Sequence, residues 1–198
     1  MSADRAPTFV NERGMTVEIR RAKTKADVAY ASQRWCKYFG LAEGDDPPME
    51  WLTNVFDDSD LCVFLADTGE RRVGCGIAYI TTFEWVDEEN IHTDLRSHYD
   101  ETPANVVYFP FATVDPAARG TGVYSALIDA RIEYFDAAPA ESILTTSWLR
   151  DDAPTSYSAL SEAGFEELTR ESYDDRVSCP DCGSECGCDS AVLRYDYT

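Results

Sequence analysis

The sequence contains few basic residues. Its 198 residues include 17 lysines and arginines against 37 acidic residues, which gives a formal net charge of -20, and the lysines are Lys23, Lys25 and Lys37 alone. An acidic chain repels a phosphate backbone, so we expect no nucleic-acid partner, and a cationic substrate fits the charge better. The acidic residues are spread along the whole chain rather than gathered in a tail. This pattern is typical of a halophilic protein, because at molar salt like charges are screened beyond ~3 Å.

Long apolar runs are also missing. No segment approaches the ~20 consecutive apolar residues that cross a bilayer, and the first residues, MSADRAPTFVNERG, contain no apolar signal core. We therefore predict a cytoplasmic protein without a membrane partner. The chain has no G-K-[ST] sequence, which disfavours a nucleotide-binding loop of that class. Its two histidines, His92 and His98, have no regular metal-ligand spacing, and we interpret them as solvated loop residues.

The composition predicts one globular domain. The chain is 44% hydrophobic and 12% aromatic, and 198 residues fit one domain better than two. We expect a mobile tail at residues 1–15 and a single domain at 16–198, which acts as a monomer or a homodimer.

The most informative stretch runs from residue 106 to 135, VVYFPFATVDPAARGTGVYSALIDARIEYF. Residues 106–114 form a continuous apolar run, which predicts a strand buried on both faces. The apolar spacing of residues 123–135 predicts an amphipathic helix. Between them, Gly120 and Gly122 allow backbone N–H groups to converge at the positive end of the helix dipole, where a phosphate or pyrophosphate would fit. On the loop alone, a simple tight turn is an equally good interpretation.

The segment VDPAARGTGVYSAL at 114–127 resembles the acyl-CoA pyrophosphate loop of the GNAT-type N-acetyltransferase superfamily, written R/Q-x-x-G-x-G/A. Arg119 and Gly122 match the pattern, whereas Tyr124 occupies a position where that family prefers Gly or Ala. The resemblance implies that acetyl-CoA binds this segment. The residues that it implies as cofactor-binding are Ala112, Thr113, Val114, Arg119, Gly120, Thr121, Gly122, Val123, Tyr124 and Ser125.

The resemblance also implies the fold: an α/β protein of the α+β kind, with a mixed central sheet of about 6–7 strands and about four helices. The patterns of apolar residues agree with it. They predict strands at 17–20, 61–66, 72–83, 106–114, 142–149, 166–173 and 191–197. They predict four helices: one after Thr24, one at 49–56, one at 123–135 and one before Gly164. Thr24 can cap the first of these helices. The acidic connection at 84–105 is predicted to be a loop that forms a lid.

Acetyl transfer needs a base for the amine and a proton for the leaving thiolate. Glu84, just past the predicted 72–83 strand, is the candidate base, although Asp87 or Glu88 could serve and a surface role is the simpler interpretation. The segment TSYSALSEAGF at 155–165 resembles the second signature of the family, A-x-x-L-Y-x-x-x-G-F. Leu160 occupies the position of the tyrosine that often donates the proton in that family. Tyr157 and Ser156 supply the nearest hydroxyls. Tyr157 is the candidate acid, with an aromatic packing role equally weighted.

The backbone around Pro110 is predicted to leave the sheet ladder. Proline has no N–H to donate, so its place within the 106–114 strand indicates a bulge or a splayed edge. Backbone groups of residues 111–114 would then be available to the pantetheine arm of the cofactor and to the thioester oxygen.

The cysteines form two groups. Cys36, Cys62 and Cys75 lie in apolar segments, and we expect them to be buried small hydrophobic residues. The insertion at 177–190 resembles a zinc knuckle in its spacing, and we predict one structural zinc held by Cys179, Cys182, Cys186 and Cys188. Two disulfides, an iron–sulfur cluster and unmodified thiols are the alternatives.

Two functional hypotheses follow from this reading. The first is an acyl-CoA-dependent N-acyltransferase that moves an acetyl group from acetyl-CoA to the amine of a small molecule or protein. The second is a non-catalytic acyl-CoA-binding sensor or interaction module with a zinc-bound tip. Leu160 and Tyr124 favour the second hypothesis, whereas the segment from Arg119 to Gly122 favours the first.

Overall fold

A computed structural model describes residues 8–10, 14–39, 52, 54–89, 95–149, 156–172 and 188–197. Among these residues its α-helices are α1 (Lys25–Phe39), α3 (Phe83–Glu89), α4 (Val123–Phe135) and α5 (Ser156–Glu162). The strands are β1 (Thr8–Val10), β2 (Thr16–Arg21), β3 (Leu61–Asp67), β4 (Arg72–Thr82), β5 (Asn105–Val114), β6 (Ser142–Leu149), β7 (Glu166–Ser172) and β8 (Asp189–Asp196). Short 3-10 helices are η1 (Asn54–Phe56), η2 (Leu95–His98) and η3 (Pro116–Ala118). No helix of the described part is long and apolar enough to cross a membrane.

The strands form one eight-stranded sheet in the order β1-β2-β3-β4-β5-β6-β8-β7. Strand β5 pairs in parallel with β6, because α4 carries the chain back across the sheet, and β6 and β7 both pair antiparallel with β8. The predicted fold class, a mixed sheet with about four helices, is confirmed. The prediction of six to seven strands was one short, because it left Thr8–Val10 in a mobile tail, and these residues pair antiparallel with β2.

The contacts divide the chain into two compact units. The first comprises residues 1–78 and 111–134, and the second comprises residues 79–110 and 135–198. Strands β4 and β5 each contribute to both units.

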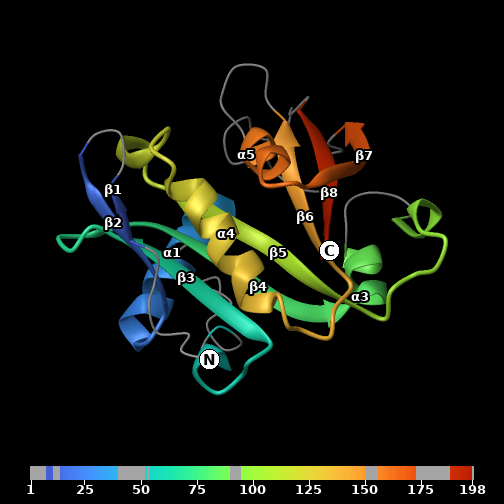
Figure 1. Cartoon of the computed structure of the whole chain (residues 1–198), viewed down its shortest axis with the longest axis horizontal. Helices are drawn as coiled ribbons and strands as arrows, with labels where there is room; N and C mark the ends of the chain where they lie inside the picture. Colours follow the sequence, from blue (N-terminus) through green and yellow to red (C-terminus); the bar gives the residue numbers. More distant parts are fainter. Residues whose placement is uncertain are drawn as a thin grey trace. The chain divides into compact units, whose positions relative to one another are not determined.

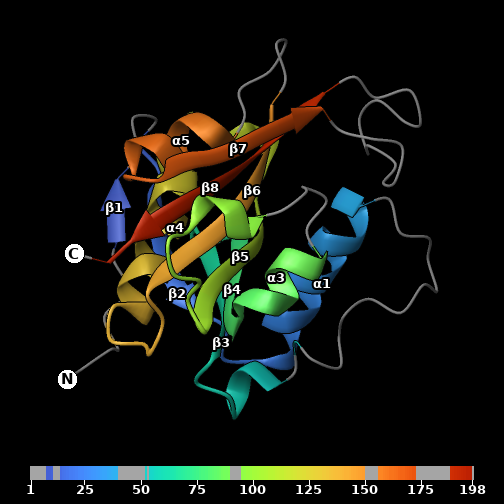
Figure 2. The same cartoon turned by 90° about the vertical axis from the view of Figure 1, so that its right-hand side faces the viewer.

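In the first unit, α1 and α4 cover opposite faces of the strands β2, β3 and β4 (Figures 1 and 2). The predicted cap of α1 is confirmed, because Thr24 Oγ1 accepts a hydrogen bond from the N–H of Asp27 at 3.2 Å. Cys62 and Cys75 are fully buried in this unit, as predicted, and burial raises the pKa of each thiol to about 12. Cys36 on α1 is only half-buried, so the prediction was wrong for this residue. Half of the short helix predicted at 49–56 lies outside the described residues, and its last three residues form the 3-10 helix η1.

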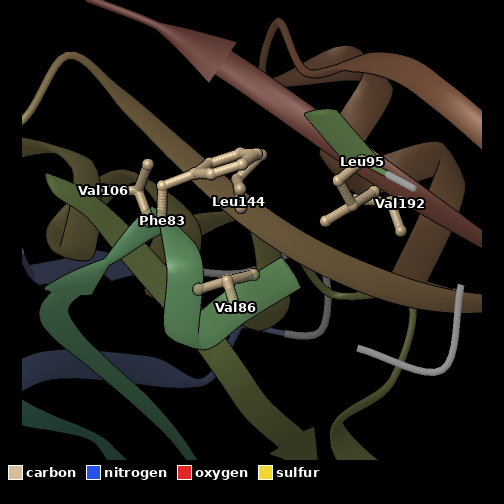
Figure 3. Packing of buried hydrophobic residues seen from close by; sticks show 6 residues of the cluster. All are labelled: Phe83, Val86, Leu95, Val106, Leu144 and Val192. Carbon is tan, nitrogen blue, oxygen red and sulfur yellow. The ribbon is translucent and has the colours of Figure 1, made fainter. Parts of the chain in front are cut away.

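In the second unit, the connection predicted to be a loop is partly helical. The helix α3 begins at Phe83, where the predicted strand would still continue, and η2 follows. The reason is visible in Figure 3: Phe83 and Val86, one turn apart on α3, pack with Leu95 of η2 into a buried cluster. The other members of that cluster are Val106 of β5, Leu144 of β6 and Val192 of β8.

The parallel pairing of β5 with β6 covers Val107 to Phe109, and Pro110 follows directly. At this point the buried hydroxyl of Thr145 donates to the carbonyl oxygen of Phe109 at 2.9 Å. A side chain thus satisfies the carbonyl that precedes the proline. This arrangement agrees with the expectation that the ladder changes at Pro110.

Candidate active site

The loop after β5 begins with Asp115, which is fixed from two sides in the first unit. Its N–H donates to the carbonyl oxygen of Val73 on β4 at 2.7 Å. Its carboxylate accepts a hydrogen bond from the guanidinium of Arg34 on α1. The start of the loop is therefore attached both to the sheet and to α1.

Within the loop, side chains bond back to the backbone. Thr121 is 4% exposed, and its hydroxyl donates to the carbonyl oxygen of Ala118 at 2.6 Å. The Nε of Arg119 donates to the carbonyl oxygen of Val114 at 3.3 Å. These two hydrogen bonds link residues of the loop to its own backbone. They restrict the backbone conformation, so the N–H groups of the loop are preorganised.

Gly120 and Gly122 both have left-handed backbone conformations, with φ of +67° and +80°. Among the described residues, apart from each glycine and its two neighbours in the chain, no heavy atom lies within 4 Å of the position that a Cβ on Gly120 would occupy, and only Cε2 of Phe9 does so at Gly122, at 3.8 Å. Glycine is required here by the backbone conformation rather than by crowding. The space in front of both residues is open to a ligand.

The helix α4 starts directly after this turn. The N–H of Ala126 donates back across the turn to the carbonyl oxygen of Gly122, at 3.0 Å. The first N–H groups of any α-helix have no acceptor within the helix, and the helix dipole adds positive potential there. A loop with two glycines that leads into such a helix start can bind an anionic group through its backbone.

The structure brings the predicted cofactor-binding residues together. All ten lie at the end of β5, in the loop, or in the first turn of α4, within the first unit. A hollow of about 510 Å³ adjoins the loop on its β1 side. Its lining includes Phe9 and Val10 of β1, the residues 120–122, and the α4 residues from Ser125 to Glu133 that face β1.

The candidate base, Glu84, lies in the first turn of α3 in the second unit. Its side chain is 71% exposed, and its carboxylate oxygen is 3.8 Å from a guanidinium nitrogen of Arg96. The alternative Asp87 is committed to local structure, because it accepts hydrogen bonds from the Nε of Arg96 at 2.9 Å and from the N–H of Leu95 at 3.0 Å. Glu88 is exposed on the same helix.

The candidate acid, Tyr157, lies in the first turn of α5, also in the second unit. The guanidinium of Arg170 lies 5.5 Å from the centre of its ring. The hydrogen bonds from Arg170 lower the pKa of Glu167 on β7 against the opposing effect of burial, and the Tyr157 hydroxyl adds a smaller lowering. Leu160, at the family's tyrosine position, is 1% exposed and belongs to the core. Ser156 shares a hydrogen bond of 2.6 Å with the buried Ser147 of β6.

Of the four predicted zinc ligands, Cys179, Cys182 and Cys186 lie outside the described residues. Cys188 is half-buried and directly precedes β8. In the part of the chain that the structure describes, no three His, Cys, Asp or Glu side chains are placed to hold a metal ion. The zinc site stays a prediction.

Sequence reasoning missed Arg131, which is 2% exposed on the inner face of α4. One sequence feature could have indicated a buried arginine: Arg131 is a charged residue between the apolar positions Leu127 and Phe135 of an amphipathic helix. The second feature is the run Gly74-Cys75-Gly76 in β4, because glycines in a strand leave room for a neighbouring side chain such as that of Arg131.

No protein-family model matches the sequence, and no curated protein matches it. Solved structures do match the fold. Arabidopsis thaliana NAA60 in complex with acetyl-CoA is 16% identical with a TM-score of 0.62, over 91% of this chain and 98% of that one. The chain has the fold of the GNAT acetyltransferases.

Two further structures with the GNAT fold are similar to the chain. Mosquito arylalkylamine N-acetyltransferase like 5b is 13% identical with a TM-score of 0.63, over 91% of this chain and 99% of that one. The ribosomal-protein-S18-alanine N-acetyltransferase of Escherichia coli is 13% identical with a TM-score of 0.56, over 92% of this chain and 94% of that one.

Proposed function

We propose that the protein is an acyl-CoA-dependent N-acyltransferase that moves an acetyl group from acetyl-CoA to the amine of a small molecule or protein. The observation that carries the proposal is the open backbone cradle at Gly120 and Gly122 before α4. The solved structures with the same fold support it, because their names state acetyl-CoA as a bound molecule and arylalkylamine or alanine as what is acetylated. The acceptor of this protein is an amine of unassigned identity.

Each step of the proposed acetyl transfer is assigned to a group of the protein or of the cofactor. Acetyl-CoA, when bound, supplies an acetyl thioester. An alkyl ammonium with a pKa near ~10.4 must lose a proton before its nitrogen can attack, and Glu84 takes that proton directly or through water. The nitrogen forms a bond to the carbonyl carbon, the carbon–sulfur bond breaks, and the products are an amide and the thiol of CoA. Backbone N–H groups of residues 111–114 polarise the carbonyl oxygen.

Tyr157 is the candidate that returns a proton to the leaving thiolate. The Tyr157 hydroxyl also helps to lower the pKa of Glu167, so it has a structural role on β7 as well. A thiolate with a pKa near ~8.5 leaves with little help. We therefore assign Tyr157 a smaller share of the rate acceleration than Glu84.

The test of the proposal is a pair of glycine variants. Gly122→Val places a branched side chain in the cradle, whereas Gly69→Val introduces the same backbone strain in the turn between β3 and β4. The match is close, since φ is +80° at Gly122 and +81° at Gly69, and Gly69 also faces open space. Calorimetric titration with acetyl-CoA at molar salt should show loss of most of the affinity in Gly122→Val only. Equal affinity in the two variants, or no binding by the unmodified protein, would remove the basis of the proposal.

The second candidate function is the acyl-CoA-binding sensor. The buried Leu160 favours it, because a core leucine stands where the family's proton donor is expected. The two candidates differ in one result. A sensor binds acetyl-CoA but transfers no acetyl group to any amine, whereas an acyltransferase does both.

We also propose one structural zinc at Cys179, Cys182, Cys186 and Cys188. The spacing of these cysteines supports it, and a closed four-thiolate shell would stabilise the chain between β7 and β8 rather than take part in catalysis. Elemental analysis of protein purified without chelator should find zinc, and replacement of the four cysteines by serine should remove it. A zinc content below about half an equivalent, by the usual one-site stoichiometry, would exclude the site.

A further inference from the structure

Asp115 begins the loop between β5 and α4, and its contacts join three elements of the first unit. Its N–H donates to the carbonyl oxygen of Val73 on β4 at 2.7 Å. Its carboxylate forms an ion pair with the guanidinium of Arg34 on α1. The sheet therefore fixes the backbone at this point, while α1 fixes the side chain.

The carboxylate of Asp115 is not used for the local hydrogen bond that its position favours. Asp115 is the N-cap of η3, and an aspartate there commonly accepts a hydrogen bond from an N–H of the first helical turn. Within the described residues its side chain makes no such hydrogen bond. The carboxylate instead accepts from Arg34, which lies 81 residues earlier in the chain. A contact between distant elements thus takes the place of a local cap.

A short series of hydrogen bonds leads from Asp115 to the glycines of the cradle. The carbonyl oxygen of Asp115 accepts a hydrogen bond from the N–H of Ala118 at 2.8 Å. The carbonyl oxygen of Ala118 in turn accepts one from the hydroxyl of Thr121 at 2.6 Å. Thr121 stands between Gly120 and Gly122 in the sequence. A displacement of Asp115 is therefore transmitted to the backbone of the cradle.

Arg34 is itself held in place by an aromatic ring. Tyr30 precedes it by four residues on α1, so the two side chains are neighbours on one face of the helix. The Cζ of Arg34 lies 5.1 Å from the centre of the Tyr30 ring, and the Cζ of Arg72 on β4 lies 5.6 Å from it. Both distances are within the range of a cation–π interaction. Because the ring restricts the Arg34 side chain, less conformational entropy is lost when the guanidinium pairs with Asp115.

The ion pair is partly shielded from solvent. The side chains of Arg34 and Asp115 are 24% and 14% exposed. Salt screens partly buried pairs much less than exposed ones. The contact should therefore persist at the molar salt concentrations that the net charge of -20 suggests.

We propose that Arg34 and Asp115 are positioning residues for the cofactor: their ion pair orders the loop at 116–122 in the conformation that binds the pyrophosphate of acetyl-CoA. Neither residue is among the predicted cofactor-binding residues, so both act through the backbone of the loop. The inference rests on the proposed function, since it concerns how the loop is prepared for this cofactor. It adds α1 to the elements on which cofactor affinity depends.

Two single variants and their combination test this role by calorimetric titration with acetyl-CoA at molar salt. Arg34→Met removes the guanidinium and keeps an apolar stem, and Asp115→Asn removes the charge and keeps the shape of the side chain. Each should weaken binding by roughly tenfold, because a loop that is ordered about a tenth of the time binds with about a tenth of the affinity. The double variant should bind no more weakly than Arg34→Met, because both substitutions remove the same contact.

Hydrogen–deuterium exchange of the ligand-free protein gives a second measurement that does not depend on the cofactor. The N–H groups of Ala118 and Arg119 donate to the carbonyl oxygens of Asp115 and Pro116. In Arg34→Met these two N–H groups should exchange faster, because the loop opens more often. Exchange in β8, which belongs to the second unit, should not change.

Asp67→Asn is the matched control. Asp67 at the end of β3 forms an ion pair with Arg20 at 3.3 Å, in the same unit and with similarly buried side chains. This variant loses a comparable charge pair away from the loop and should keep the affinity of the unmodified protein. Equal loss of affinity in Asp67→Asn and Asp115→Asn would show a general loss of stability and overturn the inference.

The outcomes separate this inference from the proposed function. If the unmodified protein binds acetyl-CoA and Arg34→Met binds equally well, only the positioning role is wrong. If the unmodified protein does not bind acetyl-CoA, the proposed function is wrong, and the exchange data decide separately whether the ion pair orders the loop. Unchanged exchange at Ala118 and Arg119 in Arg34→Met would overturn that ordering role. Should Arg34→Met fail to fold, Asp115→Asn and the control decide the question by the same two measurements.

Discussion

Asp27 is a buried carboxylate that joins α1 to the sheet of the first unit. It is 1% exposed and accepts hydrogen bonds from both terminal nitrogens of Arg20, at 3.2 and 3.0 Å, and from Arg72 at 2.7 Å. The N–H groups of Lys23 and Thr24 also donate to it, each at 3.0 Å. Burial by itself raises the pKa of Asp27, but these hydrogen bonds outweigh it and hold the pKa well below its usual range.

This lowered pKa predicts acid sensitivity. A carboxyl group whose pKa is lower in the folded state stabilises the fold above its unfolded pKa of ~3.9, and this stabilisation is lost as the pH falls below that value. We expect Asp27→Asn to lower the free energy of unfolding by about 3 kcal/mol at pH 7, because one partner of a buried ion-pair network is removed. The difference between the two proteins should shrink below about pH 4.

Denaturant unfolding at a series of pH values and constant salt checks this prediction. Asp136→Asn is the control, since Asp136 is exposed after the end of α4. A constant difference between native and Asp27→Asn proteins from pH 7 to pH 3 would contradict the account of Asp27.

Glu84 is the proposed general base. Replacement by glutamine removes the proton acceptor and keeps the size of the side chain, so kcat should fall by roughly 10²–10⁴-fold with little change in KM for acetyl-CoA. Steady-state kinetics with an identified acceptor amine measure this. Glu101→Gln, another exposed glutamate of the second unit, is the control. If Glu88→Gln loses activity and Glu84→Gln does not, Glu88 is the base.

At the scale of elements, the unit of strand, glycine loop and helix was predictable from the sequence. The helix was predicted at residues 123–135 and observed at Val123–Phe135, and the strand differs by one residue at its start. Both elements have strong local signals, namely a continuous apolar run and a regular apolar spacing. The positive φ of Gly120 and Gly122 follows equally from local chemistry.

The elements that were missed depend on contacts with distant parts of the chain. The strand β1 has three residues and exists through its pairing with β2. The helix α3 has four acidic residues among its seven, FEWVDEE, which indicates a solvated loop by composition. What makes it a helix is the packing of Phe83 and Val86 against residues of β5, β6 and β8. The burial of Arg131 depends likewise on Gly76, which lies on another element.

The hydrogen bond between Thr145 of β6 and Phe109 of β5 leads to a prediction about how these two elements are held together. Thr145→Val keeps the shape of the side chain and leaves the carbonyl oxygen of Phe109 without the hydroxyl that donates to it. We expect a loss of about 1–3 kcal/mol in the free energy of unfolding, the usual cost of an unsatisfied buried polar group. Urea unfolding of Thr145→Val and of Thr169→Val, a half-buried threonine of β7, makes the comparison. Equal stability of the two variants would show that the hydroxyl at Thr145 is not needed.

At the scale of the whole molecule, the net charge of -20 sets the conditions for folding. Carboxylates at this density repel one another at low ionic strength, and the repulsion is screened at molar salt. We expect the melting temperature to rise by roughly 5–10 °C between dilute buffer and molar potassium chloride. Calorimetric scans at several salt concentrations measure the change. A melting temperature that does not depend on salt would contradict the prediction of a halophilic protein.

The central claim is that the protein acetylates an amine with acetyl-CoA. Its most direct test is a screen of small amines and peptide amines at molar salt, in which the release of CoA thiol is followed and the acceptor is then weighed by mass spectrometry. The account predicts thiol release that requires an amine, an acceptor that gains one acetyl group, and loss of both signals in Gly122→Val but not in Gly69→Val. Acetyl-CoA binding without transfer to any amine in the screen would contradict the account and leave the sensor as the function.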